Sequence, residues 1–281
     1  MWPLIKFELH KIWKQKKSMT GLIAIAGINI LFAIAFILRQ RHPDRRHNRE
    51  LSDEMFQEMF NAFVYVQTIL APCLWMLFPV VIGVLGSHLL AGELELGTLR
   101  MVLGRPVLRS QVLLAKFVTL SLYSLVLLLG LGFVSYGIGA CILKPSGDLI
   151  LFGPMFGHPD KMLIVHQAAV ALPRIILSYL LAWPMLMAVS AMTLMFSMIT
   201  RHFTSAAILT VTVYFCSYVV GGIPMLSSIH PYLPTRYFPF WKYALLEKIP
   251  WDQIANDALW TGGYTVAFLG VAIAIFNRRD L

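Results

Sequence analysis

Six long apolar runs constrain the fold of this chain more than any other feature. A helix of about 20 residues crosses the hydrocarbon core of a bilayer, which is about 30 Å thick. The runs cover residues 19–38, 69–91, 112–141, 170–199, 203–226 and 258–276. Because 58% of all residues are hydrophobic and only 13% are charged, the chain is too apolar for a soluble fold of this length. The sequence therefore predicts an all-α membrane protein, with six transmembrane helices in a single domain over residues 1–281.

Basic residues are distributed unevenly around these runs. The chain carries 23 Lys and Arg against 14 Asp and Glu, an excess that in a soluble protein would suggest nucleic acid. Here Lys and Arg border membrane spans, where the positive-inside rule expects them, so no nucleic-acid partner is indicated. The terminal segments and the loops after spans two and four are the densest in basic residues. We expect a multi-pass protein of the inner or plasma membrane with both termini in the cytoplasm, although a cluster of arginines in the first outer loop opposes this locally.

The segment before the first span predicts an amphipathic helix. Within residues 1–18, apolar side chains recur at helical spacing, with basic residues on the opposite face. The apolar set is Trp2, Ile5, Leu9, Ile12 and Trp13, and the basic set is Lys6, His10, Lys14 and Lys17. Tryptophan and long basic side chains suit the headgroup layer, so this helix is expected to lie at the surface of the lipid bilayer.

Two outer segments have unusual compositions. Residues 39–68 begin with a basic stretch and continue with the pattern of an amphipathic helix. Residues 227–257 are rich in proline and aromatic residues, which predicts short broken helices in the interface belt. From this loop Trp241, and from the fourth span Met185, Met192 and Met195, are candidates for a substrate path, because methionine adapts to varied apolar ligands. Packing within the core is the alternative for the methionines.

The connection between spans two and three carries the most specific pattern. It reads ELELGTLRMVLGRPVLRSQVLLAK from Glu93 to Lys116. Gly97 and Thr98 can end one helix and cap the next, and Pro106 stops or restarts a helix. Leu99, Val102 and Leu103 form a small apolar face between them. A short amphipathic helix at the cytoplasmic surface, within residues 92–111, is therefore expected to act as a docking element.

These residues resemble the ABC-2 type permeases, the membrane subunits of one class of ATP-binding-cassette exporters. The resemblance rests on an acidic residue before Gly-Thr-Leu, then apolar residues, Pro, a basic residue and Lys. The matching positions are Glu93, Glu95, Gly97, Thr98, Leu99, Val102, Leu103, Pro106, Arg109 and Lys116. Leu108 stands where the family commonly has a small polar residue. The first helix is similar to the connecting helix of the family, with Lys6, Glu8, Ile12 and Trp13 as its interfacial residues.

The resemblance implies a mechanism without catalytic chemistry in this chain. Similar proteins pair two permease subunits, identical or not, with two ATPase subunits, and the loop helix fits a groove on each ATPase. Glu93 and Glu95 would pair with basic residues of the ATPase or of the N-terminal helix. Arg109 and Lys116 would bind lipid phosphate or helix C-termini, unless these charges are ordinary solvated residues. ATP and Mg would bind the partner ATPase, because this sequence contains no GxxxxGK[ST] loop; no cofactor or metal is expected here.

Three functions remain open at this stage. The first is export of an amphipathic or hydrophobic cargo, such as an antimicrobial peptide, a drug or a lipid-like molecule. The second is a non-transporting membrane scaffold or sensor whose loop docks a cytoplasmic protein. The third, an intramembrane hydrolase, is disfavoured because the sequence has no HExxH or GxSxG motif and no catalytic set in the spans.

Overall fold

The computed structural model describes residues 2–14, 19–41, 60–99, 108–153, 163–200 and 202–278. Six membrane-length apolar helices are present in these residues, which confirms the predicted fold class. A short helix, α1 (Trp2–Lys14), precedes them. The first span is α2 (Met19–Arg41). The second is one continuous stretch made of α4 (Ala62–Pro72), the π-helix η2 (Cys73–Leu77) and α5 (Phe78–Glu95). The other four are α7 (Arg109–Ile142), α8 (Ala168–Thr200), α9 (Phe203–Gly221) and α11 (Trp251–Arg278).

Three span boundaries differ from the sequence prediction. The second span begins at Ala62, because Asn61 Oδ1 accepts hydrogen bonds from Phe63 N (3.0 Å) and Val64 N (3.1 Å) and so caps the helix. The fifth span ends at Gly221 instead of residue 226, and the sixth begins at Trp251 instead of residue 258. The helix predicted within residues 39–68 falls largely on residues 42–59, which lie outside the described residues.

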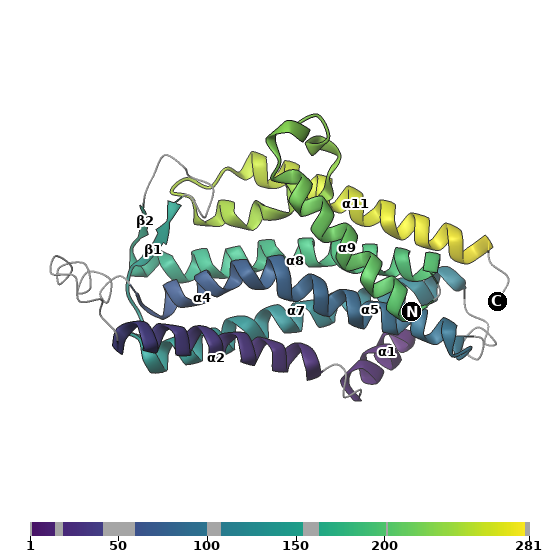
Figure 1. Ribbon diagram of the computed structural model, residues 1–281, viewed down its shortest axis with the longest axis horizontal. Helices are drawn as coiled ribbons and strands as arrows, with labels where there is room; N and C mark the ends of the chain where they lie inside the picture. The colour runs from purple at the N-terminus through teal and green to yellow at the C-terminus, as the bar shows by residue number, and fades with distance from the viewer. Residues whose placement is uncertain are drawn as a thin grey trace.

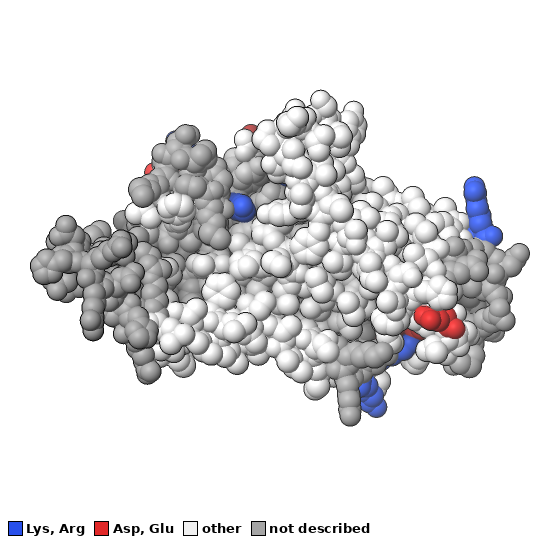
Figure 2. Space-filling model, viewed as in Figure 1, with Lys and Arg blue, Asp and Glu red and all other residues white. Residues whose placement is uncertain are grey.

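Helix α8 lies at the centre of the bundle. It packs against α5, α7, α9 and α11 (Figure 1), and more of its surface is buried than that of α2, α9 or α11. Charged side chains are sparse along the middle of the face shown in Figure 2 and are found toward its ends. The apolar sides of α2, α9 and α11 therefore face lipid or another membrane chain.

A polar contact inside the membrane joins three spans. Asn29 in α2 is fully buried, and its Oδ1 accepts a hydrogen bond from Ser135 Oγ of α7 at 2.8 Å. Tyr65 of α4 donates its hydroxyl to the Asn29 carbonyl at 2.9 Å. Such buried polar contacts fix how membrane helices pack, because apolar surfaces alone do not distinguish lipid from protein.

A two-stranded sheet between α7 and α8 was not predicted. Strands β1 (Leu149–Phe152) and β2 (Leu163–His166) pair antiparallel, with Leu149 opposite His166 and Phe152 opposite Leu163. Each strand has four residues, a length at which periodicity does not separate a strand from a loop. We call the end of the bundle with this sheet the hairpin end. Helix α1 and the last turns of α11 lie toward the opposite end, the termini end (Figure 1).

Short helices follow α9, as the proline content predicts, and two side chains of the α8 region anchor them. They are η4 (Pro224–Leu226), η5 (His230–Tyr232), α10 (Pro234–Tyr237) and η6 (Phe238–Leu245). Arg174 Nη1 donates to the carbonyls of Ala244 (3.0 Å) and Leu246 (2.7 Å). His166 Nε2 lies 2.7 Å from the Leu245 carbonyl. These contacts provide hydrogen-bond partners for consecutive carbonyls at the end of η6. The last carbonyls of a helix have no partner within the helix itself.

Candidate functional site

Gly97 ends α5, as the sequence predicts. Its φ angle is +70°. This backbone conformation is energetically unfavourable for an L-residue with a side chain, but not for glycine. Its amide donates to the Leu94 carbonyl at 3.2 Å, and the Leu96 amide donates to the Gly92 carbonyl at 3.1 Å. Thr98 Oγ1 donates a hydrogen bond back to the Glu93 carbonyl at 3.4 Å. The chain therefore leaves the membrane helix sharply, with its last carbonyls satisfied.

A charge cluster made of Glu8, Lys11, Glu93 and Lys116 lies beside this turn. Lys116, two turns into α7, is fully buried. Its Nζ donates to Glu8 Oε1 of α1 at 2.9 Å, to Glu93 Oε2 of α5 at 2.7 Å and to the Leu89 carbonyl at 3.0 Å. An ammonium group has three protons to donate, so all of them are used. Lys116 thus holds α1 and α5 against α7.

The cluster is balanced in charge. Lys11 of α1 binds the other oxygen of Glu93, Oε1, so two cations face two carboxylates. Glu8 Oε2 is buried without a hydrogen-bond partner in the structure. A buried ion is expensive unless it is paired, so removing one member of the cluster leaves its partners without compensation.

Glu95 and Arg109 connect the same segment to two further helices. Glu95 Oε2 accepts a hydrogen bond from Phe203 N at 3.2 Å, and its Oε1 lies 3.5 Å from His202 Nδ1. Its carboxylate therefore meets the positive N-terminus of α9. Arg109 Nη1 donates to the Phe276 carbonyl at 3.2 Å, near the C-terminus of α11. Of the partners considered from sequence, Glu93 meets the N-terminal helix and Arg109 meets a helix C-terminus, whereas Glu95 and Lys116 find partners that were not considered.

The structure corrects the role expected of Leu99. This side chain is only 1% exposed and packs in a core cluster with Leu90, Val112 and Phe276. A partner protein cannot contact a side chain that is enclosed by its own chain, so Leu99 does not belong to a docking face. Val102, Leu103 and Pro106 lie outside the described residues. Among the described residues of this segment, the exposed large apolar side chains are Leu96, at the turn, at 74% and Leu108 at 65%.

Helix α1 has an inner face that the sequence analysis did not predict. Glu8 and Ile12 are buried against the bundle, whereas Trp2, Leu9 and Trp13 are exposed. Lys6 is also exposed, with its Nζ 5.5 Å from the ring centre of Trp2. The exposed tryptophans fit a helix that contacts the interface of a bilayer, and the buried carboxylate fits one that is fixed to the bundle.

The substrate path predicted from sequence is filled by packing. Met185 and Trp241 are fully buried and Met192 is 4% exposed, and all three belong to the main hydrophobic core. Met195 is partly buried against the second core cluster. This burial favours packing within the core, the alternative to a substrate path, for these side chains.

Sequence reasoning missed Lys11, His202, Phe203 and Phe276 as partners in this site. For Lys11 a signal existed: Glu8, Lys11 and Ile12 are three and four residues apart and so share one face of a helix. The contacts of Phe203 and Phe276 use backbone atoms, which no side-chain pattern identifies. Among the described residues, no group of three or more His, Cys, Asp and Glu side chains could hold a metal ion.

Comparison with known proteins identifies a family. The sequence model of a family described as ABC-2 family transporter protein matches residues 2–281. A search of curated proteins gave no match. The matched range includes α1, all six spans and the whole site described above.

Proposed function

Because this chain belongs to the ABC-2 family of transporter proteins, whose membrane subunits associate with ABC ATPases, we propose that it is the permease of an exporter. ATP is hydrolysed by two copies of a separate ATPase chain, which also bind Mg. A second permease, identical or similar, completes the membrane part. The complex lies in the cell membrane with both termini of this chain in the cytoplasm.

The observation that carries the proposal is the position of Lys116 and its two carboxylates. The segment 100–107 is flanked by Glu93 and Glu95 on one side and by Arg109 and Lys116 on the other. All four side chains contact other helices, namely α1, α5, α7, α9 and α11 for the two pairs taken together. A force applied to this segment by an ATPase would therefore reach five helices at the termini end of the bundle.

Such an arrangement suits a transporter that alternates between two conformations. Closure of the ATPases would displace the segment 100–107, and the helices tied to it would move as a packed unit instead of deforming one by one. The transition is then a change between two arrangements of the membrane helices, inward-open and outward-open, whose populations ATP shifts.

We also propose an amphipathic or hydrophobic cargo, such as a peptide, a drug or a lipid-like molecule. Buried charge is rare along the described parts of the spans away from the charge cluster: the buried polar groups there are mainly Ser, Thr, Asn and Gln side chains. A path for an inorganic ion would need charged or closely spaced polar groups near the middle of the membrane.

The test is the ATPase activity of the co-expressed complex in lipid nanodiscs. Val102 and Leu103 are replaced together by Asp, and Met225→Asp, at an exposed position of η4, is the matched control. We expect an ATPase to co-purify with the wild type and with the control, and its association or turnover to be lost in the double variant. A double variant that binds and stimulates the ATPase like wild type would refute the docking role. Stable capture of a protein without ATPase motifs would instead favour the scaffold function.

A further inference from the structure

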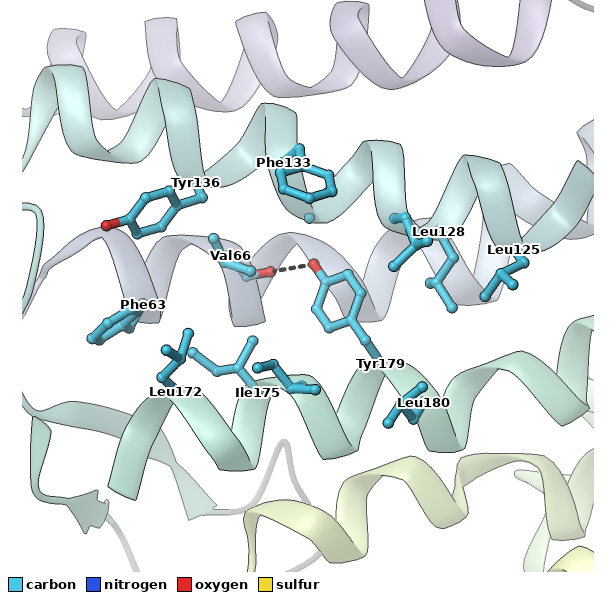
Figure 3. A pocket seen from close by; sticks show the side chains of 13 residues that line it. Phe63, Val66, Leu125, Leu128, Phe133, Tyr136, Leu172, Ile175, Tyr179 and Leu180 are labelled. Atoms are coloured by element: carbon cyan, nitrogen blue, oxygen red, sulfur yellow. Dashed lines mark hydrogen bonds between the residues drawn. The ribbon is translucent and has the colours of Figure 1, made fainter. Parts of the chain in front are cut away.

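A cavity of about 470 Å³ opens between α4, α7 and α8 toward the hairpin end. Figure 3 shows Phe133 and Tyr136 of α7 on one side, Ile175 and Tyr179 of α8 on the other, and Val66 of α4 behind them. Its volume falls in the range of small-molecule sites, about 300–1,000 Å³. None of the substrate-path residues chosen from sequence lines it.

The wall of the cavity offers almost no hydrogen-bonding group to a ligand. The lining is aliphatic and aromatic apart from two tyrosine hydroxyls. Tyr179 donates its hydroxyl to the Val66 carbonyl at 3.3 Å, a contact drawn in Figure 3, and Tyr136 donates to the Pro145 carbonyl at 3.4 Å. A polar molecule would lose its hydration here without compensation, whereas an alkyl chain would lose none.

The mouth of the cavity faces out of the bundle. Phe133 is 77% exposed, and Ile176 and Leu180 are also exposed. All three belong to α7 and α8, two helices long and apolar enough to cross the membrane. The medium at the mouth is therefore the hydrocarbon of the bilayer, from which an acyl chain can enter sideways.

A basic side chain lies beyond the hairpin end of the cavity. Lys144 is exposed, two residues after the end of α7, and it is adjacent in sequence to Pro145, whose carbonyl binds Tyr136. The last residues of α7, from Tyr136 to Ile142, rise about 9 Å. A chain seated in the cavity would thus place its polar end near the level of Lys144, where a phosphate would be attracted.

From the apolar lining, the lateral mouth and the position of Lys144, we propose that this cavity binds one acyl chain of an anionic membrane phospholipid. The lipid headgroup lies toward Lys144, and the chain packs between Phe133 and Ile176. The bound lipid would fill a gap between α7 and α8 that the protein leaves unpacked. This inference needs only that the chain spans a bilayer, and it stands independently of the proposed export function.

The test uses the full-length chain in nanodiscs that contain phosphatidylglycerol with a photoreactive diazirine near the end of one acyl chain. After irradiation, mass spectrometry locates the labelled residues. We expect labelling of the cavity wall at Phe133 to exceed that of Ile208 in α9, an apolar residue of similar exposure outside the cavity. The bulky variant Ile176→Trp should abolish the excess, and Ile208→Trp, a matched control, should leave it unchanged, with both variants eluting as wild type in size exclusion.

Two further experiments define the ligand. Lys144→Glu should lower labelling by the phosphatidylglycerol probe and leave labelling by a phosphatidylcholine probe unchanged. Equal labelling of Phe133 and Ile208, or labelling that Ile176→Trp does not reduce, would overturn the proposal. It would also be overturned if Phe133→Cys, in a chain whose three cysteines are replaced by Ser, forms disulfide-linked dimers in membranes, because a second copy would then cover the mouth.

Discussion

The single side chain of Lys116 connects three helices. Its ammonium is fully buried, and it donates hydrogen bonds to Glu8, Glu93 and the Leu89 carbonyl. Sequence suggested that this Lys and Glu93 belong to one motif, but their partners depend on how α1 packs against the bundle, which a linear pattern does not contain. The pairing of Lys11 with Glu93 is of the same kind.

Removing this charge should destabilise the protein. Lys116→Met leaves two carboxylates buried with Lys11 as their remaining cation in the cluster. Breaking a buried ion pair by removing one partner costs about 3–5 kcal/mol. We expect a clearly lower Tm in detergent, followed by tryptophan fluorescence, whereas Lys144→Met at an exposed position should leave Tm near that of wild type.

A second substitution at Glu93 tests whether the residues act as one unit. Glu93→Gln combined with Lys116→Met should destabilise the chain by less than the sum of the two single variants, since each removes the same interaction. Strict additivity would show that the two side chains contribute independently and would contradict the charge cluster.

Gly97 allows a test of the turn before segment 100–107. At its φ of +70° a side chain costs about 1–2 kcal/mol. Gly97→Ala should therefore weaken the end of α5 and reduce ATPase stimulation in the co-expressed complex. Gly137→Ala, in a helical position of α7 with open space around it, is the control and should retain wild-type stimulation.

Among the elements, α5, α7 and α8 approach one another closely at Gly86. A Cβ built there would lie 2.6 Å from Leu120 Cδ2 and 2.8 Å from Thr193 Cγ2, both closer than atoms pack. In α11, a Cβ built at Gly263 or Gly270 has nothing within 4 Å. A glycine within a span thus marks a close approach at one position and open space at another, and only the tertiary arrangement separates the two cases.

Gly86→Ala should accordingly lower the free energy of unfolding. Overpacking costs about 1–3 kcal/mol, which outweighs the gain of about 0.5–1 kcal/mol that alanine brings to a helix. Gly270→Ala has that gain without the clash, so its Tm should equal or exceed that of wild type. Measuring both variants in the same detergent decides the matter, and equal Tm values would contradict the close approach at Gly86.

The elements show where sequence reasoning succeeds. Spans α2, α7 and α8 were located to within a few residues, because apolar runs of that length have no other stable solution in a membrane. The early start of α4 was missed because its cap, Asn61, uses its other polar atom, Nδ2, on the Asp148 carbonyl (2.7 Å), a contact 87 residues away in sequence. For Leu99, an apolar period alone does not tell a docking face from a buried one.

For the whole molecule, the arrangement of the bundle makes the proposed orientation testable with the native cysteines. Cys141 is exposed near the hairpin end of α7, Cys73 is buried, and Cys216 is exposed along α9. If the termini are cytoplasmic, a membrane-impermeant maleimide added to intact cells should label the wild type, and Cys141→Ser should lose the label. Cys216 should stay unlabelled because it lies within the span formed by α9, which an impermeant reagent does not enter. Labelling of Cys141 only after lysis would reverse the orientation.

The length of α7 has a consequence for how small movements spread through the molecule. Its 34 residues form one uninterrupted helix, which begins at Arg109 beside segment 100–107 and ends next to the two-stranded sheet. Such a helix is a rigid lever about 50 Å long, with Lys116 near one end and Tyr136 near the other. A tilt of about 5° pivoting at the first end would displace the far end by about 4 Å. An input too small to rearrange any side chain at the termini end would then still change the width of the cavity between α7 and α8.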